Sequence, residues 1–134
     1  MTPNAPTPLP PLILLAEDNA ASAEVTEEIL SLLGYRVIVA RDGISTVRMA
    51  NEHLPDLILM DWHMPGLDGL SATRQIKASP NTQLIPIVSL TAFAMEPDIA
   101  ACLAAGAADH IAKPVDFDAL PEIISRNLKS RREP

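Results

Sequence analysis

The chain has 134 residues, a formal net charge of −7 and 48% hydrophobic residues. This length suits one domain with a single core, and the apolar content is high enough to offset the chain entropy lost on folding. The acidic balance repels phosphate backbones and acidic lipid surfaces, and only 3% of the residues are aromatic. We therefore expect neither nucleic-acid binding nor membrane attachment.

The N-terminal segment is rich in proline, since residues 1–11 hold five of the 13 prolines. Such a segment lacks backbone donors and apolar bulk, which predicts an extended, poorly ordered lead-in at residues 1–11. A proline-rich docking peptide is the alternative interpretation. A folded domain is expected at residues 12–130 and a short tail at 131–134. No apolar run has the length of a membrane span and no basic region precedes the first one, which predicts a cytoplasmic protein without a signal peptide.

Strand-like and helix-like segments alternate along the domain. In chain order the predicted elements are a strand at 12–16, a helix at 19–33, a strand at 35–40, a helix at 44–53, a strand at 56–60, a helix at 67–78, a strand at 85–90, a helix ending near 105–106, a strand at 109–112 and a last helix starting near 118. The strands are continuous apolar or β-branched runs, as in sheets buried on both faces. This alternation predicts an α/β fold with helices covering both faces of a parallel sheet.

Local signals indicate where the helices begin and end. Asn19 is the expected N-cap of the first helix and Gly34 its C-terminal stop. Pro97 fits the first turn of the fourth helix, and Pro121 requires that the last helix start late. The larger apolar residues of the first helix are expected on one side: Val25, Ile29, Leu32 and Leu33.

Polar residues stand at the ends of four predicted strands, where ligands bind in parallel sheets. These residues are Glu17, Asp18, Asp61, Ser89, Thr91 and Lys113. Three carboxylates at close quarters need a cation, and oxygen ligands suit Mg²⁺ or Mn²⁺. A carboxylate can also act as a nucleophile and form an aspartyl-phosphate, which a metal, an ammonium group and a hydroxyl can stabilise. The pattern therefore predicts metal-dependent phosphoryl transfer to an aspartate.

Four segments, AEDN, LILMDWHMPGLDGL, SLTAFA and AKPVD, resemble the signature blocks of response-regulator receiver domains. The resemblance spans residues 12–130 and implies a flavodoxin-like, doubly wound sheet of strand order 2-1-3-4-5 with five helices. It implies that a histidine kinase or a histidine phosphotransfer protein phosphorylates Asp61 in a Mg²⁺-dependent two-component phosphorelay. The chain would then be a signalling module, with self-phosphorylation and slow autodephosphorylation as its only chemistry.

The resemblance also implies a role for each matching residue. The implied metal ligands are Asp18, Asp61, the His63 backbone carbonyl and, through water, Glu17. The implied phosphoryl-binding groups are the Thr91 hydroxyl, the Lys113 ammonium and the backbone N–H groups of Trp62 and Ala92. A cis bond is implied between Lys113 and Pro114.

Thr91 and His110 occupy the positions of the family's switch residues. The resemblance implies that they alter a docking face for a downstream protein, formed by the helix around residues 98–105, the strand at 109–112 and the last helix. His110 stands where many receivers carry Tyr or Phe; it either packs as a ring in the same way or biases the switch through its protonation. Glu17 replaces the commoner Asp.

Three other functions are alternatives to that of a phosphorylated receiver. A haloacid-dehalogenase-type hydrolase needs a second aspartate where this chain has His63. A nucleotide- or flavin-binding module needs a phosphate-cradling loop where this chain has the acidic Glu17 and Asp18. A receiver that acts only as a phosphorylation-independent scaffold is the main alternative, although such receivers typically lose Asp18, Asp61 or Lys113. Whether the chain is a stand-alone regulator or part of a hybrid kinase stays open.

Overall fold

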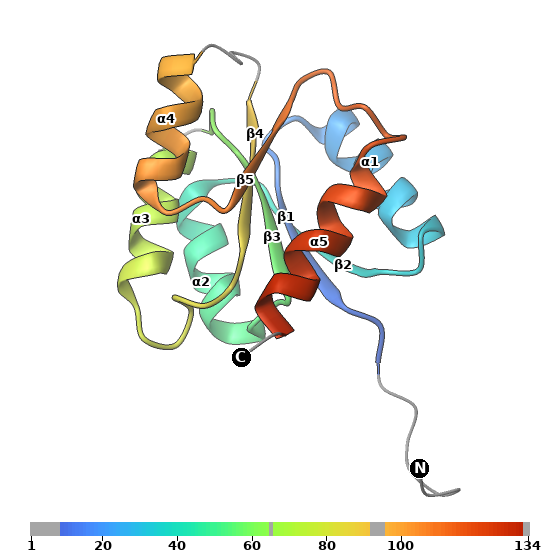
Figure 1. Cartoon of the computed structure of the whole chain (residues 1–134), viewed down its shortest axis with the longest axis horizontal. Coiled ribbons are helices and arrows are strands. Elements are labelled where there is room, and N and C mark those ends of the chain that lie inside the picture. The colour runs from blue at the N-terminus through green and yellow to red at the C-terminus, as the bar shows by residue number, and fades with distance from the viewer. Residues whose placement is uncertain (1–8, 65, 92–95, 133–134) are drawn as a thin grey trace, which may run out of the picture.

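The computed structural model describes residues 9–64, 66–91 and 96–132, in which five strands and five helices alternate (Figure 1). The strands are β1 (Leu12–Ala16), β2 (Arg36–Ala40), β3 (Leu57–Asp61), β4 (Ile87–Thr91) and β5 (Asp109–Ala112). The helices are α1 (Ala20–Leu32), α2 (Gly43–His53), α3 (Gly69–Ala78), α4 (Glu96–Ala105) and α5 (Leu120–Arg132). None of the helices in these ranges is long and apolar enough to cross a membrane.

The five strands form one parallel sheet in the order β2-β1-β3-β4-β5. Helices α1 and α5 cover one face, and α2, α3 and α4 cover the other (Figure 1). This arrangement confirms the predicted doubly wound α/β fold. Because all strands run in the same direction, their carboxyl ends lie along one edge of the sheet, at the top of Figure 1.

Alternate residues of the central strands supply two separate cores. Every residue of β3 and β4 is buried. In β1, Ile13 and Leu15 pack with α1 and α5, whereas Leu14 and Ala16 pack with α2 and α3. The continuous apolar runs in the sequence therefore correspond to strands with a core on each face, as expected.

The buried face of α1 differs from the sequence-based expectation. Its buried residues are Ala23, Thr26 and Leu30, whereas Val25 is exposed and Leu32 is 81% exposed. Helix α1 has two rows of residues with helical spacing. The row that packs on the sheet starts with Ala23 and Thr26, whose small side chains let the helix backbone approach closely. The expectation that the larger residues share one side was therefore wrong as a guide to burial. Among them only Ile29 packs against the core.

Capping residues fix the helix starts. The Asn19 side chain accepts a hydrogen bond from the Ser22 amide at 2.9 Å, and Gly34 adopts a positive φ of 97° just after α1, which confirms both predicted ends of that helix. Helix α3 begins at Gly69, two residues later than expected, because Asp68 is its N-cap.

The last helix begins at Leu120, so Pro121 lies in its first turn as required. It continues to Arg132, past the predicted domain end at residue 130. Residues 1–8, Ala92 and residues 133–134 lie outside the described parts of the chain. The predicted division into lead-in, domain and tail stays a prediction.

Candidate functional site

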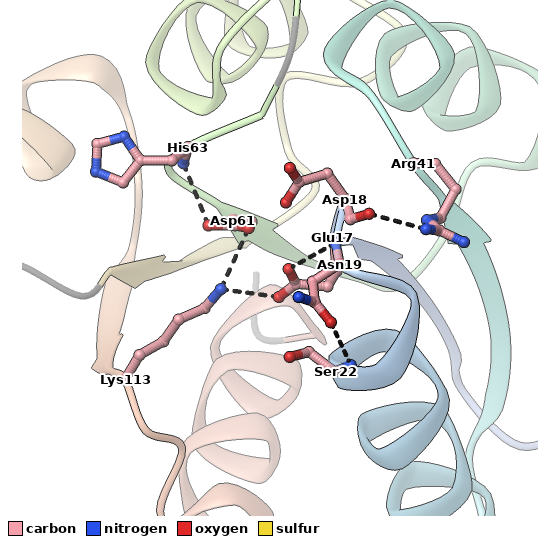
Figure 2. Close-up of polar contacts among 8 residues, drawn as sticks. All are labelled: Glu17, Asp18, Asn19, Ser22, Arg41, Asp61, His63 and Lys113. Atoms are coloured by element: carbon pink, nitrogen blue, oxygen red, sulfur yellow. Dashed lines mark hydrogen bonds and ion pairs between the residues drawn. The ribbon is translucent and has the colours of Figure 1, made fainter.

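Four charged residues from three strand ends meet at the carboxyl edge of the sheet (Figure 2). Glu17 and Asp18 directly follow β1, Asp61 is the last residue of β3, and Lys113 follows β5. Strands β1 and β3 are neighbours, which places the three acidic residues side by side. The structure therefore brings together the four charged residues that the sequence singled out.

The carboxylates of Glu17, Asp18 and Asp61 form a compact cluster. One oxygen from each lies within 4.8 Å of the others. Asp18 is exposed, whereas Glu17 is 3% and Asp61 is 4% exposed. Like charges this close repel one another strongly in a poorly solvated site. A set of oxygen ligands of which one faces solvent suits Mg²⁺, because this ion usually keeps several bound waters. The residues present thus fit a hard divalent cation.

Lys113 bridges the two buried acids of this cluster. Its Nζ lies 2.9 Å from Oε2 of Glu17 and 3.2 Å from Oδ2 of Asp61. Burial alone would lower the pKa of the Lys113 ammonium, but the hydrogen bond to Glu17 and the charges of both acids raise it. Lys113 is therefore a fixed positive charge beside Asp61. Its own amide donates to the Thr91 carbonyl at 2.8 Å, and the bond to Pro114 is cis, the geometry that the resemblance implied.

The surroundings of Asp61 disfavour its charged form. Burial and the adjacent Glu17 carboxylate raise the pKa of Asp61 from 3.8 to about 6, against the opposing effects of the His63 amide and the Lys113 charge. One lysine consequently does not compensate for three carboxylates. An additional cation would lower the pKa of Asp61 and keep its oxygens available as a nucleophile.

The loop after β1 is anchored from two sides. The Asn19 amide donates to Oε1 of Glu17 at 3.2 Å, and the Arg41 guanidinium donates to the Asp18 carbonyl at 2.8 Å (Figure 2). Sequence reasoning missed Arg41. An exposed arginine after a strand carries no signal of its own, because its partner lies 23 residues away along the chain.

The backbone after Asp61 extends the pairing of the sheet. The Trp62 amide donates to the Leu90 carbonyl at 2.9 Å and so continues the ladder between β3 and β4. Its expected role toward a phosphoryl group stays a prediction. The amide that faces the Asp61 carboxylate belongs to His63, at 3.2 Å from Oδ1, while the His63 imidazole points away from the cluster (Figure 2).

The expected switch residues lie on the strands beyond Asp61. Thr91 is the last residue of β4 and fully buried, and His110 is partly buried on β5. Ser89, a further candidate from the sequence, pairs in register with His110. The Ser89 hydroxyl is fully buried and has no hydrogen-bond partner among the described residues. Ser89 thus belongs to the interior and not to the site.

An open, mainly apolar groove of about 350 Å³ adjoins the charged cluster. Glu17 and Lys113 line one part of it. Helix α1, including Val25, and the segment after β5, including Phe117, line the rest. A second molecule seated in this groove would lie directly beside the site.

Residues 13–125 match the response regulator receiver domain family. The chain is 32% identical over 120 residues to the polar-differentiation response regulator DivK of Brucella anthropi, which covers 90% of this chain and 98% of DivK. It is 45% identical, with a TM-score of 0.84, to the receiver domain of sensor histidine kinase PA1611 from Pseudomonas aeruginosa PAO1, whose crystal structure has a magnesium ion coordinated in the active site cleft; 90% of this chain and 98% of that chain are covered. A histidine-kinase receiver domain from Syntrophus aciditrophicus shares 33% identity and a TM-score of 0.85, over 92% of this chain and 94% of that one. The chain therefore belongs to the response regulator receiver domains, the signalling modules of two-component systems.

Proposed function

We propose that this receiver domain accepts a phosphoryl group on Asp61, in a Mg²⁺-dependent reaction, from a phosphohistidine of a histidine kinase or a histidine phosphotransfer protein. The observation that supports this most is the position of Asp61: a buried carboxylate that forms an ion pair with Lys113 and lies within metal-ligand reach of Glu17 and Asp18. A related receiver domain with 45% identity has a magnesium ion coordinated in its active site cleft.

Asp18, Asp61 and the His63 carbonyl would hold the ion directly, and Glu17 would hold it through water. The ion would supply positive charge to the oxygens of the incoming phosphoryl group. An Asp61 oxygen forms the new bond to phosphorus while the bond from phosphorus to the partner's histidine nitrogen breaks, which returns a neutral histidine after protonation. Lys113 is close enough to Asp61 to transfer its ion pair to a phosphoryl oxygen.

The raised pKa of Asp61 makes this chemistry depend on the cation. The nucleophile must be ionised, and a pKa of about 6 leaves part of the carboxyl groups protonated in mildly acidic solution. Lys113 offsets some of the repulsion from Glu17, but the net shift stays upward. Metal binding and proton release from Asp61 should therefore be coupled.

The partner would approach from the carboxyl edge of the sheet, because that is where Asp61 is reached. Such a partner would cover the apolar groove, which adjoins Lys113 and Glu17. For output, Thr91 pairs with Ala112 of β5 and His110 lies on β5. We propose that α4, β5 and α5 form the docking face for a downstream protein. The location in the cytoplasm stays a prediction from the sequence.

Binding of beryllofluoride, a stable mimic of the phosphoryl group, tests this proposal. The indole of Trp62 adjoins Asp61 and is half-buried, so its fluorescence should change when Mg²⁺ binds and again when beryllofluoride is added. Asp61→Asn should abolish the second change. The matched control Asp118→Asn removes an exposed carboxylate outside the cluster and should respond like the wild type. Absence of both changes in the wild type would favour the phosphorylation-independent scaffold.

A further inference from the structure

The loop between β3 and α3 is held between the first turns of two helices. Helix α2 begins with Asp42-Gly43 and helix α3 with Asp68-Gly69. In each pair the aspartate is the N-cap. Its side chain accepts a hydrogen bond from the backbone amide three residues later, at 2.7 Å for Asp42 and 2.8 Å for Asp68. The glycine is the first residue of the helix.

Gly43 lies against the backbone of this loop. A Cβ atom added to Gly43 would be 1.8 Å from the carbonyl oxygen of Leu67 and 2.6 Å from its carbonyl carbon. Real Cβ atoms essentially never come within 3.0 Å of such atoms. The first turn of α2 therefore approaches the loop more closely than any residue with a side chain allows.

Gly69 approaches the other end of the loop in the same way. A Cβ atom added there would be 2.3 Å from the carbonyl oxygen of Asp61 and 2.9 Å from the Cα of Trp62. The Gly69 amide also donates to the Trp62 carbonyl at 3.2 Å. The first residue of α3 thus rests on the peptide group that follows the proposed phosphoacceptor.

Space, and not backbone conformation, accounts for glycine at these two positions. Neither Gly43 nor Gly69 has a positive φ, whereas Gly34 and Gly66 do, and those two have open space where a Cβ would lie. The two classes of glycine separate the effect of a close contact from that of backbone strain.

We infer that Gly43 and Gly69 are positioning residues for the metal and phosphoryl site: they let two helix starts clamp the β3–α3 loop and fix the Asp61 carboxylate and the His63 backbone. The inference rests on the proposed function, because it assumes that the position of this loop matters for binding the metal and the phosphoryl group. An alanine at either position must displace the loop backbone by about 1 Å, because its Cβ would otherwise lie 1.8 or 2.3 Å from a carbonyl oxygen. Mutation of groups that orient metal ligands typically weakens metal affinity about 10- to 100-fold.

The test compares Mg²⁺ affinity and thermal stability in four variants of the full chain. Gly43→Ala and Gly69→Ala carry the contact, and Gly66→Ala and Gly34→Ala are matched controls that add only backbone strain, the former within the same loop. Calorimetric titration with MgCl₂ measures the affinity, and circular dichroism measures the melting temperature. We expect all four to melt earlier than wild type, but only the Gly43 and Gly69 variants to bind Mg²⁺ at least about tenfold more weakly.

Each other outcome has a defined meaning. If the wild type binds Mg²⁺ and both contact variants bind it equally well, the inference is overturned while the proposed function stands. The same holds if the control variants lose as much affinity as the contact variants. If both contact variants stay unfolded even in sucrose while the controls fold, the glycines serve the whole fold and the inference is again overturned. If the wild type binds no Mg²⁺, the proposed function fails and takes the inference with it.

Discussion

Replacing Asp61 with asparagine is expected to stabilise the metal-free protein, although it removes the proposed phosphoacceptor. The carboxylate is 4% exposed and lies beside Glu17, so ionising it in the folded state is unfavourable even with Lys113 at 3.2 Å. Asparagine has nearly the same shape without the charge. The negative charge of Asp61, which the proposed function needs, would then lower the stability of the folded protein.

The size of the effect follows from the pKa of Asp61, which folding raises from 3.8 to about 6. Between these values the folded state binds more protons than the unfolded state, so stability falls as the pH rises through the window. Above about pH 6 the cost is complete. A shift of this size corresponds to about 3 kcal/mol, which sets the upper limit for the gain on substitution.

Urea unfolding in the presence of EDTA, followed by Trp62 fluorescence and circular dichroism, measures this gain. At about pH 8 we expect Asp61→Asn to be more stable than wild type by about 2–3 kcal/mol, and at about pH 4 the difference should nearly vanish. The control Asp18→Asn removes an exposed carboxylate from the same cluster and should change stability by at most about 0.5 kcal/mol. Adding Mg²⁺ should stabilise the wild type more than Asp61→Asn.

Two results would refute this reasoning. The first is an Asp61→Asn protein that is less stable than wild type at the alkaline pH. The second is a gain in stability of equal size at both pH values, because a gain that does not depend on pH cannot come from the charge of Asp61.

Two further predictions use pairs of matched residues. Arg41→Ala should weaken Mg²⁺ binding about threefold, because the Asp18 backbone loses an anchor worth about 0.5–1 kcal/mol, whereas Arg36→Ala, which removes a similar bond to a carbonyl at the other end of β2, should leave it unchanged. Tighter binding in calorimetric titration of Arg41→Ala would show that relief of charge repulsion outweighs the anchor. Thr73 and Thr82 are both fully buried. The Thr82 hydroxyl donates to the Ile76 carbonyl at 2.7 Å, whereas the Thr73 hydroxyl lacks a hydrogen-bond partner within the described residues. Urea unfolding should show that Thr82→Val costs about 1–2 kcal/mol and that Thr73→Val is neutral or stabilising; equal losses would contradict this.

The order and direction of the elements were predictable because central strands of this fold need apolar residues on both faces. Such strands appear in the sequence as continuous apolar runs, for example residues 12–16. The end of β3 was less clear, since Asp61 reads as a loop residue although it still belongs to the strand. The buried face of α1 was not predictable, because two stripes have helical spacing and only contact with the sheet selects the one with Ala23.

The charged part of the site was predictable from a simple rule, namely that polar residues at the carboxyl ends of parallel strands converge. That rule placed Asp61 and Lys113 together, and their ion pair is present. It says nothing of contacts between backbones that are distant in sequence, and so the approach of Gly43 to Leu67 and the bond from Arg41 were missed. The rule also says nothing of the bond from the Trp62 amide to the Leu90 carbonyl, with which the sheet ladder continues one residue beyond the end of β3.

The most direct test of phosphorylation at Asp61 is the intact mass of the protein after incubation with acetyl phosphate and Mg²⁺. Wild type should gain the mass of one phosphoryl group, peptide mapping after borohydride reduction should locate it at Asp61, and EDTA should prevent it. Asp61→Asn, folded by circular dichroism, should gain nothing. An adduct of equal yield on Asp61→Asn, or none on a wild type that binds Mg²⁺, would contradict the assignment.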